Sequence, residues 1–182
     1  MKKMLKNVLF SALIATGSAQ ADTLVVYYSA TGCTQRAALT IAKTLKAEVV
    51  ELLPAKPYTD EDLNWRDQNS RVSREHDSLE LRKVKLVNAK IENFDRYDTV
   101  FVGYPIWWGI AAWPIDTFIN SNSFKGKKVI PFATSASSPL GQSAKLLEKM
   151  ADGGQWSEGM RFGSFADEKE IVKWALTAVN EK

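Results

Sequence analysis

The chain of 182 residues contains one cysteine, Cys33, and one histidine, His76. A single cysteine excludes a disulfide bond within the chain, and the sequence has no cluster of His and Cys that could hold zinc or iron. His76 stands in the polar stretch SREHDS, which indicates an exposed loop or turn residue rather than a catalytic one. Internal repeats and low-complexity segments are also lacking. A content of 45% apolar and 25% charged residues is typical of one globular α/β or α+β domain.

The first 21 residues have the pattern of a secretory signal peptide. Three lysines precede a short apolar stretch, 8–15, and the segment closes with Ala19-Gln20-Ala21, an A-x-A cleavage pattern. The apolar stretch is far shorter than the roughly 20 residues that a membrane span needs. We therefore expect cleavage after Ala21, export to the periplasm, and a single mature domain over 22–182 that has no membrane association.

Cleavage would also remove the excess of positive charge. The whole chain has 24 basic and 21 acidic residues, and the first 21 residues contribute three lysines and no acid. The mature chain is therefore left with 21 residues of each sign and a net charge near zero. Nucleic-acid binding, for which a basic surface is expected, gains no support from this balance.

Apolar runs and amphipathic stretches alternate along the mature chain. Strands are predicted at 23–28, 47–54, 98–105, 126–135 and 158–164, and helices at 34–45, 113–121, 140–151 and 167–179. A long polar region, 55–96, has no strand signal, and one helix is predicted near 78–87. Strands that alternate with helices indicate an α/β fold, in which helices cover both faces of a parallel sheet.

The loop SATGCT (29–34) follows the first strand and precedes the first helix. It places Gly32 and three hydroxyl side chains at a helix N-terminus, where unpaired N–H groups attract anions. The loop has neither the lysine of a nucleoside-triphosphate loop nor the pattern G-x-G-x-x-G. A thiol phosphatase would need an arginine six residues after Cys33, where this chain has Leu39. The pattern favours a phosphate held by neutral donors, although taken alone it also fits a tight turn with a capping Ser or Thr.

Two further loops would meet the first at the carboxyl edge of the sheet, where such folds bind ligands. GYPIWWGIAAWP (103–114) contains Trp107 and Trp108, and TSASSPLG (134–141) is small and rich in hydroxyl groups. Aromatic residues usually belong to a core, but these follow a buried strand beside the predicted phosphate loop, which favours walls for a flat ring. A phosphate and a flat ring together describe a mononucleotide.

The three loops resemble those of the flavodoxin family. Residues 29–34 with Ala38 resemble its phosphate loop, DTVFVGYPIWWG its second flavin loop and IPFATSASSPLGQS its third. The resemblance implies a flavodoxin-like, doubly wound, five-stranded parallel sheet and FMN as the cofactor. The residues implied to bind FMN are Ser29, Ala30, Thr31, Gly32, Cys33 and Thr34, then Pro105, Ile106, Trp107, Trp108 and Gly109, and finally Thr134, Ser135, Ala136, Ser137 and Gly141.

The resemblance implies a redox protein that carries electrons outside the cytoplasm, to an unidentified redox protein or a small electron acceptor. The nearly neutral mature chain departs from the acidic carriers of the family, so docking by charge on a basic partner is not implied. An alternative function is an FMN-dependent NAD(P)H:quinone-type reductase, in which Trp107, Trp108 and Trp113 would form an apolar pocket, although no second nucleotide motif is present.

A flavin-free binding module on the same fold is the third alternative. The region 55–96, which is long for a flavodoxin, either covers the flavin, recognises a partner or is a surface excursion.

Overall fold

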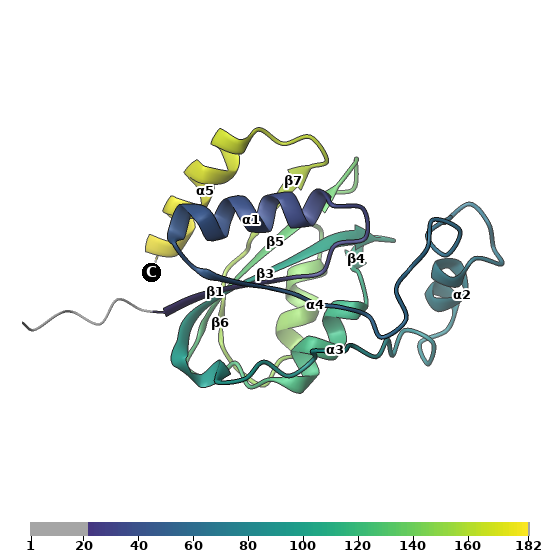
Figure 1. The fold of residues 1–182 in the computed structure, drawn as a ribbon, viewed down its shortest axis with the longest axis horizontal. Helices are drawn as coiled ribbons and strands as arrows, with labels where there is room; N and C mark the ends of the chain where they lie inside the picture. The colour runs from purple at the N-terminus through teal and green to yellow at the C-terminus, as the bar shows by residue number, and fades with distance from the viewer. Residues whose placement is uncertain (1–21, 182) are drawn as a thin grey trace, which may run out of the picture.

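The computed structural model describes residues 22–181 (Figure 1). The strands are β1 (Asp22–Tyr27), β2 (Glu48–Glu51), β3 (Tyr97–Trp107), β4 (Ile110–Ala111), β5 (Lys128–Ser135), β6 (Gln155–Trp156) and β7 (Met160–Gly163). The helices are α1 (Cys33–Leu45), α2 (Arg71–Asp77), α3 (Pro114–Ser121), α4 (Ser143–Met150) and α5 (Glu168–Asn180), with one 3₁₀ turn, η1 (Phe94–Arg96). The predicted signal peptide, residues 1–21, lies outside the described residues.

The parallel strands run in the order β2-β1-β3-β5-β6, and β7 also pairs with β5 in parallel. The fifth position of the sheet is thus shared by two short strands, β6 and β7. Between them, Gly159 has a φ of 81°, and a Cβ on it would lie 2.4 Å from the carbonyl oxygen of Pro131, so only glycine fits there. The chain leaves β1 toward β2 and returns to β3 on the other side of β1. The α/β fold is confirmed, and the strand order reverses between β1 and β3.

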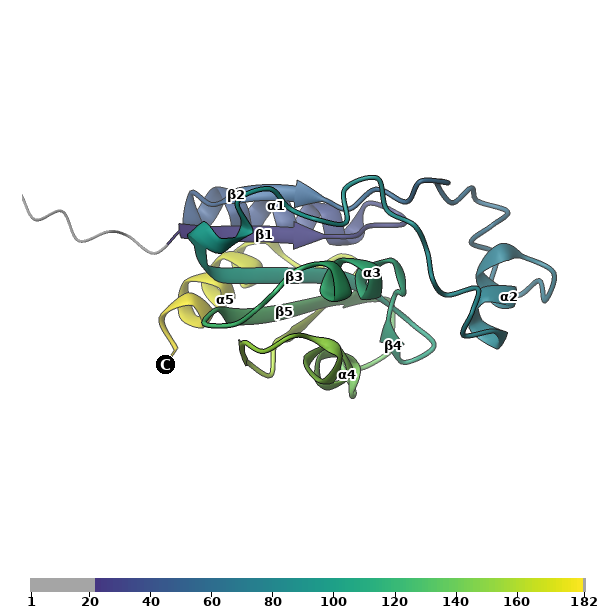
Figure 2. The same cartoon turned by 90° about the horizontal axis from the view of Figure 1, so that it is seen from below.

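The two faces of the sheet bury alternate side chains of each strand. In β1, Leu24 and Val26 join the core beneath α3 and α4, whereas Val25 and Tyr27 join the core beneath α1 and α5. Figures 1 and 2 show this arrangement, with α1 and α5 over one face and α3 and α4 over the other. Because both faces are covered, the central strands read as continuous apolar runs rather than as alternating ones.

The predicted helix near 78–87 is wrong, because the helix of the polar region is α2. The hydroxyl of Ser70 caps α2 by accepting a hydrogen bond from the N–H of Ser73, 3.2 Å away. Residues 78–87 instead form turns and a short extended stretch, in which Leu79 is exposed and Val84 is buried. Figure 2 shows α2 beyond the carboxyl ends of the strands, at the end of the molecule that carries the three loops.

The expected loop at 103–114 is largely a β-hairpin. Strand β3 continues to Trp107, which pairs with Ile110 of β4. Trp108 and Gly109 form the turn, with φ of 46° and 81°. Two central residues with positive φ are what a type I′ hairpin turn requires. The ring-site tryptophans therefore sit on a regular hairpin rather than on an irregular loop.

Within residues 22–181, no helix has both the length and the apolar character to cross a membrane. The same part of the chain holds no group of three or more His, Cys, Asp and Glu residues that could bind a metal ion.

Candidate functional site

The three sequence-predicted loops come together at the carboxyl ends of β1, β3 and β5. The Oγ1 atoms of Thr34 and Thr134 lie 2.7 Å apart in a buried hydrogen bond, which joins the first loop to the end of β5. A Cβ placed on Gly141 would lie 3.8 Å from the carbonyl oxygen of Gly109, so the third loop packs against the hairpin turn. The loops are thus in mutual contact at the point where the strand order reverses, where α/β sheets bind ligands.

The start of α1 offers unpaired hydrogen-bond donors. Gly32 is the N-cap residue with a φ of 84°, no side chain caps the helix, and its first turn contains no acidic residue. The N–H of Gly32 donates to the Oγ of Ser29 at 3.1 Å, and the N–H of Arg36 donates to the carbonyl of Gly32 at 3.0 Å. Cys33 and Thr34 are the first two residues of α1, so their N–H groups have no partner within the helix, and no capping side chain of the described residues accepts from them. Such a helix end carries a partial positive charge and suits an anion.

The side chains of the first loop differ in their access to solvent. Thr31 and Gly32 are exposed, whereas Ser29, Ala30 and Cys33 are half-buried. Thr34 is fully buried, and its hydroxyl is paired with that of Thr134.

A cavity of about 390 Å³ lies between the hairpin and the third loop. The residues that line it are Leu63, Trp65, Val72, Ile106, Trp107, Trp108, Ser135, Ala136, Ser137 and Ser138. No charged side chain is among them, and the volume is near the lower end of the range for small-molecule sites. The cavity therefore suits one flat, uncharged ring system.

Aromatic neighbours hold Trp107 in place at the base of this cavity. Its ring meets those of Tyr28, Tyr58 and Trp113 edge-on, with centroids 5.8, 5.4 and 4.9 Å away. Burial raises the pKa of Tyr28 and of Tyr58 well above the ordinary tyrosine value, and at Tyr58 the hydrogen bond to Glu75 raises the pKa further. Both phenols therefore stay neutral beside the cavity at physiological pH.

Trp108 is packed between two residues whose predicted roles are wrong. Its ring stacks on His76 at 4.5 Å and on Trp113 at 5.9 Å. His76, expected in an exposed loop or turn, is half-buried on α2. Trp113, which the reductase alternative placed in an apolar substrate pocket, is fully buried, and its Nε1 donates to the Oε2 of Glu75 at 2.8 Å. Trp113 therefore supports the hairpin from beneath. Glu75 provides the acceptor that a buried indole N–H needs.

Arg161 of β7 fixes the third loop and was missed by the sequence reasoning. Its Nε donates to the Oγ of Ser135 at 3.0 Å, and its Nη2 donates to the carbonyls of Ser135 and Ala136 at 3.0 and 3.2 Å. Ala136 and Ser137 are exposed at the tip of this loop. The one sequence signal for this contact with the third loop is the presence of a charged residue, Arg161, within the short predicted last strand.

Comparison with known proteins agrees with this geometry. The family model for flavodoxin matches residues 22–178. Proteins assigned as flavoproteins from Bacteroides eggerthii and Bacteroides uniformis are 39% and 40% identical to the chain, each with a TM-score of 0.77. These two matches cover 89% and 85% of this chain and 100% and 97% of theirs. Comparison with curated protein sequences gives no match.

A solved structure of a flavoprotein in complex with FMN, from Lactobacillus acidophilus, is also similar. It is 25% identical with a TM-score of 0.60, and the match covers 86% of this chain and 99% of that one. A helix start that suits an anion and an uncharged cavity at the switch point are features of the mononucleotide-binding class of α/β proteins. Within that class, this chain belongs to the flavodoxin family.

The residues present fit the cofactor that the family implies. The unpaired N–H groups at the start of α1 match the phosphate of FMN, and the cavity beside Trp107 and Trp108 matches its ring. None of the residues that line the cavity carries a charge.

Proposed function

We propose that this chain is an FMN-binding redox protein that carries electrons outside the cytoplasm. The observation that carries the proposal is the pairing of an uncapped helix start at Gly32 with an uncharged cavity walled by Trp107 and Trp108. The FMN bound by the Lactobacillus acidophilus flavoprotein supports the same cofactor here. A flavin-free binding module is less well supported, because nothing in the lining of the cavity would repel a flavin ring.

Each part of the site has a distinct task in this proposal. The N–H groups at the start of α1, with the exposed hydroxyl of Thr31, hold the phosphate. The hairpin and the third loop orient the ring and exclude water from it, and Gly109 gives the hairpin turn its positive φ. When bound, FMN supplies the electron-transfer chemistry, which the protein tunes through the polarity of these walls.

Electron carriage is favoured over an FMN-dependent quinone reductase. A reductase of this kind needs to recognise a nicotinamide nucleotide as well as the flavin, and the sequence has no second nucleotide-binding motif. Trp113, one of the three residues expected to form a substrate pocket, is buried beneath the hairpin. The electron acceptor is then a redox protein or small molecule that meets the ring at its exposed edge.

The carrier role is tested with the FMN-loaded protein. We expect reversible reduction and reoxidation at an electrode and no steady oxidation of NADH or NADPH. Continuous oxidation of either nucleotide with a quinone acceptor would contradict carriage and favour the reductase.

The proposed site of action depends on the pattern of residues 1–21, with three lysines, a short apolar stretch and Ala19-Gln20-Ala21. Expression of the whole chain in a Gram-negative host, followed by fractionation and mass spectrometry, tests it. We expect a periplasmic protein that begins at Asp22. An uncleaved chain in the cytoplasmic fraction would contradict export.

A further inference from the structure

The third loop lacks an aromatic side chain. Residues 134–141 are Thr, Ser, Ala, Ser, Ser, Pro, Leu and Gly, so this side of the cavity offers only small walls to a ring. The 55–96 region supplies the aromatic side chain that the third loop lacks. Its residues Leu63, Trp65 and Val72 line the same cavity. These three residues lie between strands β2 and β3 in the sequence, far from any of the three loops.

Trp65 is unusual among the tryptophans of the described chain in its exposure. Its relative exposure is 60%, although an indole is among the side chains that gain most from burial. Its only aromatic or cationic neighbour within the described contacts is the guanidinium of Arg66, whose Cζ is 4.4 Å from the ring centroid. A large apolar side chain that lines a cavity and is open to solvent fits a surface that a ligand covers.

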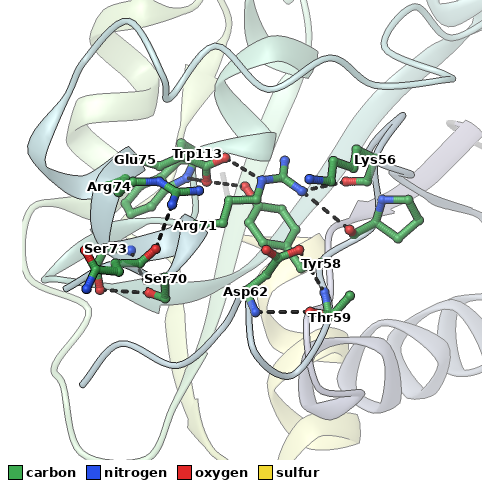
Figure 3. A network of polar contacts seen from close by, with 12 residues as sticks. Lys56, Tyr58, Thr59, Asp62, Ser70, Arg71, Ser73, Arg74, Glu75 and Trp113 are labelled. Atoms are coloured by element: carbon green, nitrogen blue, oxygen red, sulfur yellow. Dashed lines mark hydrogen bonds and ion pairs between the residues drawn. The ribbon is translucent and has the colours of Figure 1, made fainter. Parts of the chain in front are cut away.

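The segment that carries Trp65 is ordered by its own hydrogen bonds. The N–H of Thr59 donates to the Oδ2 of Asp62 at 3.2 Å, and the N–H of Asp62 donates to the Oγ1 of Thr59 at 3.1 Å (Figure 3). The N–H of Trp65 itself donates to the carbonyl of Leu63 at 2.8 Å. The indole is therefore presented on a defined turn rather than on a free loop.

A buried carboxylate fastens this segment beneath the hairpin. Glu75, only 5% exposed, accepts hydrogen bonds from Tyr58 at 2.5 Å, from Arg71 at 2.7 Å and from Trp113 at 2.8 Å. Figure 3 shows Arg71 reaching on from Glu75 to the backbone of Lys56, whose carbonyl it meets at 2.8 Å. Charge-assisted bonds in a buried site are strong and geometrically specific. They fix the 55–96 region relative to Trp113, which in turn supports Trp107 and Trp108.

We propose that Trp65 belongs to the FMN site and packs on the isoalloxazine ring, in the place where the third loop provides no aromatic wall. This inference rests on the proposed FMN-binding function. The 55–96 region is then a cover of the flavin rather than a plain surface excursion. It also limits the access of a second planar molecule to the ring.

The test compares four proteins: the wild type, Trp65→Ala, Trp65→Phe and the control Phe165→Ala. Phe165 is an aromatic residue with 94% exposure that lies outside the cavity. The Kd of each protein is measured for FMN and for riboflavin, which has the ring but no phosphate. The unfolding temperature of each flavin-free protein shows whether the substitution disturbs the fold.

We expect Trp65→Ala to raise the Kd for both flavins by the same factor, about tenfold, because a ring contact is lost and a phosphate contact is not. Trp65→Phe should keep most of the affinity, and Phe165→Ala should match the wild type. All flavin-free proteins should unfold at similar temperatures, since both side chains are exposed. An unchanged Kd in Trp65→Ala, or a loss confined to FMN, would overturn the role of Trp65. A wild type that binds no flavin would overturn the proposed function as well.

Discussion

Replacement of Asp116 measures how much the burial of an ionised carboxylate lowers the free energy of unfolding. Asp116 lies in the first turn of α3, beside a cavity of about 740 Å³ bounded by α3, α4 and residues 79–85. No hydrogen bond within the described residues reaches its carboxylate, and burial raises its pKa to about 6, against the opposing effect of Arg82. Replacement by asparagine keeps the shape of the side chain and removes the charge.

The magnitude follows from the pKa. A value of about 6 lies about two pH units above the ordinary 3.8, so the ionised carboxylate lowers the free energy of unfolding by about 3 kcal/mol at pH 7. Between pH 4 and pH 6 the folded protein binds this proton more tightly than the unfolded chain does, so this contribution to stability falls as the pH rises. We therefore expect Asp116→Asn to raise the free energy of unfolding by about 3 kcal/mol at pH 7.

The assay is urea unfolding of the wild type and of Asp116→Asn at 25 °C, at pH 7 and at pH 4. The gain at pH 7 should nearly vanish at pH 4, where Asp116 is neutral in the folded wild type. Comparing the two proteins at each pH cancels the other groups that titrate. A gain that does not depend on pH, or a loss of stability at pH 7, would refute the reasoning.

Two further changes, each with a matched control, are tested by urea unfolding. Glu75→Ala should lower the free energy of unfolding by about 3–5 kcal/mol, because its arginine partner stays buried without a counter-charge. The control Glu80→Ala, in an exposed ion pair, should change it by less than about 1 kcal/mol. Gly103→Ala should cost about 1–3 kcal/mol, since its Cβ would lie 2.2 Å from the buried ring of Phe132, whereas Gly163→Ala meets nothing within 4 Å and should be nearly neutral. Equal effects within either pair would contradict these assignments.

The sequence was sufficient to predict those helices and strands in which burial imposes a regular spacing of apolar residues. The predicted helix 34–45 corresponds to α1, which buries Ala37, Ala38 and Ile41 on one face, as the spacing of apolar residues in a helix requires. The central strands were equally clear, because a strand covered on both faces must be apolar throughout. The three ligand loops followed from their position after these strands.

The 55–96 region could not be predicted in the same way. Its helix α2 has seven residues and is held by the Ser70 cap and by the buried bonds of Glu75, which no local period reveals. The contacts of Trp65 and His76 with the ring site join parts of the chain that are distant in sequence. The hairpin was missed because Trp108 adopts a positive φ, which is uncommon for a residue other than glycine, asparagine or aspartate.

The most direct test of the central proposal is an equilibrium titration of the purified 22–182 protein with FMN and with riboflavin, followed by the quenching of flavin fluorescence. We expect one FMN per chain, bound at least about tenfold more tightly than riboflavin, because only FMN carries the phosphate that the start of α1 accepts. Equal affinities would contradict the phosphate site at Gly32. An absence of quenching by either flavin would contradict the assignment of this chain as an FMN-binding redox protein.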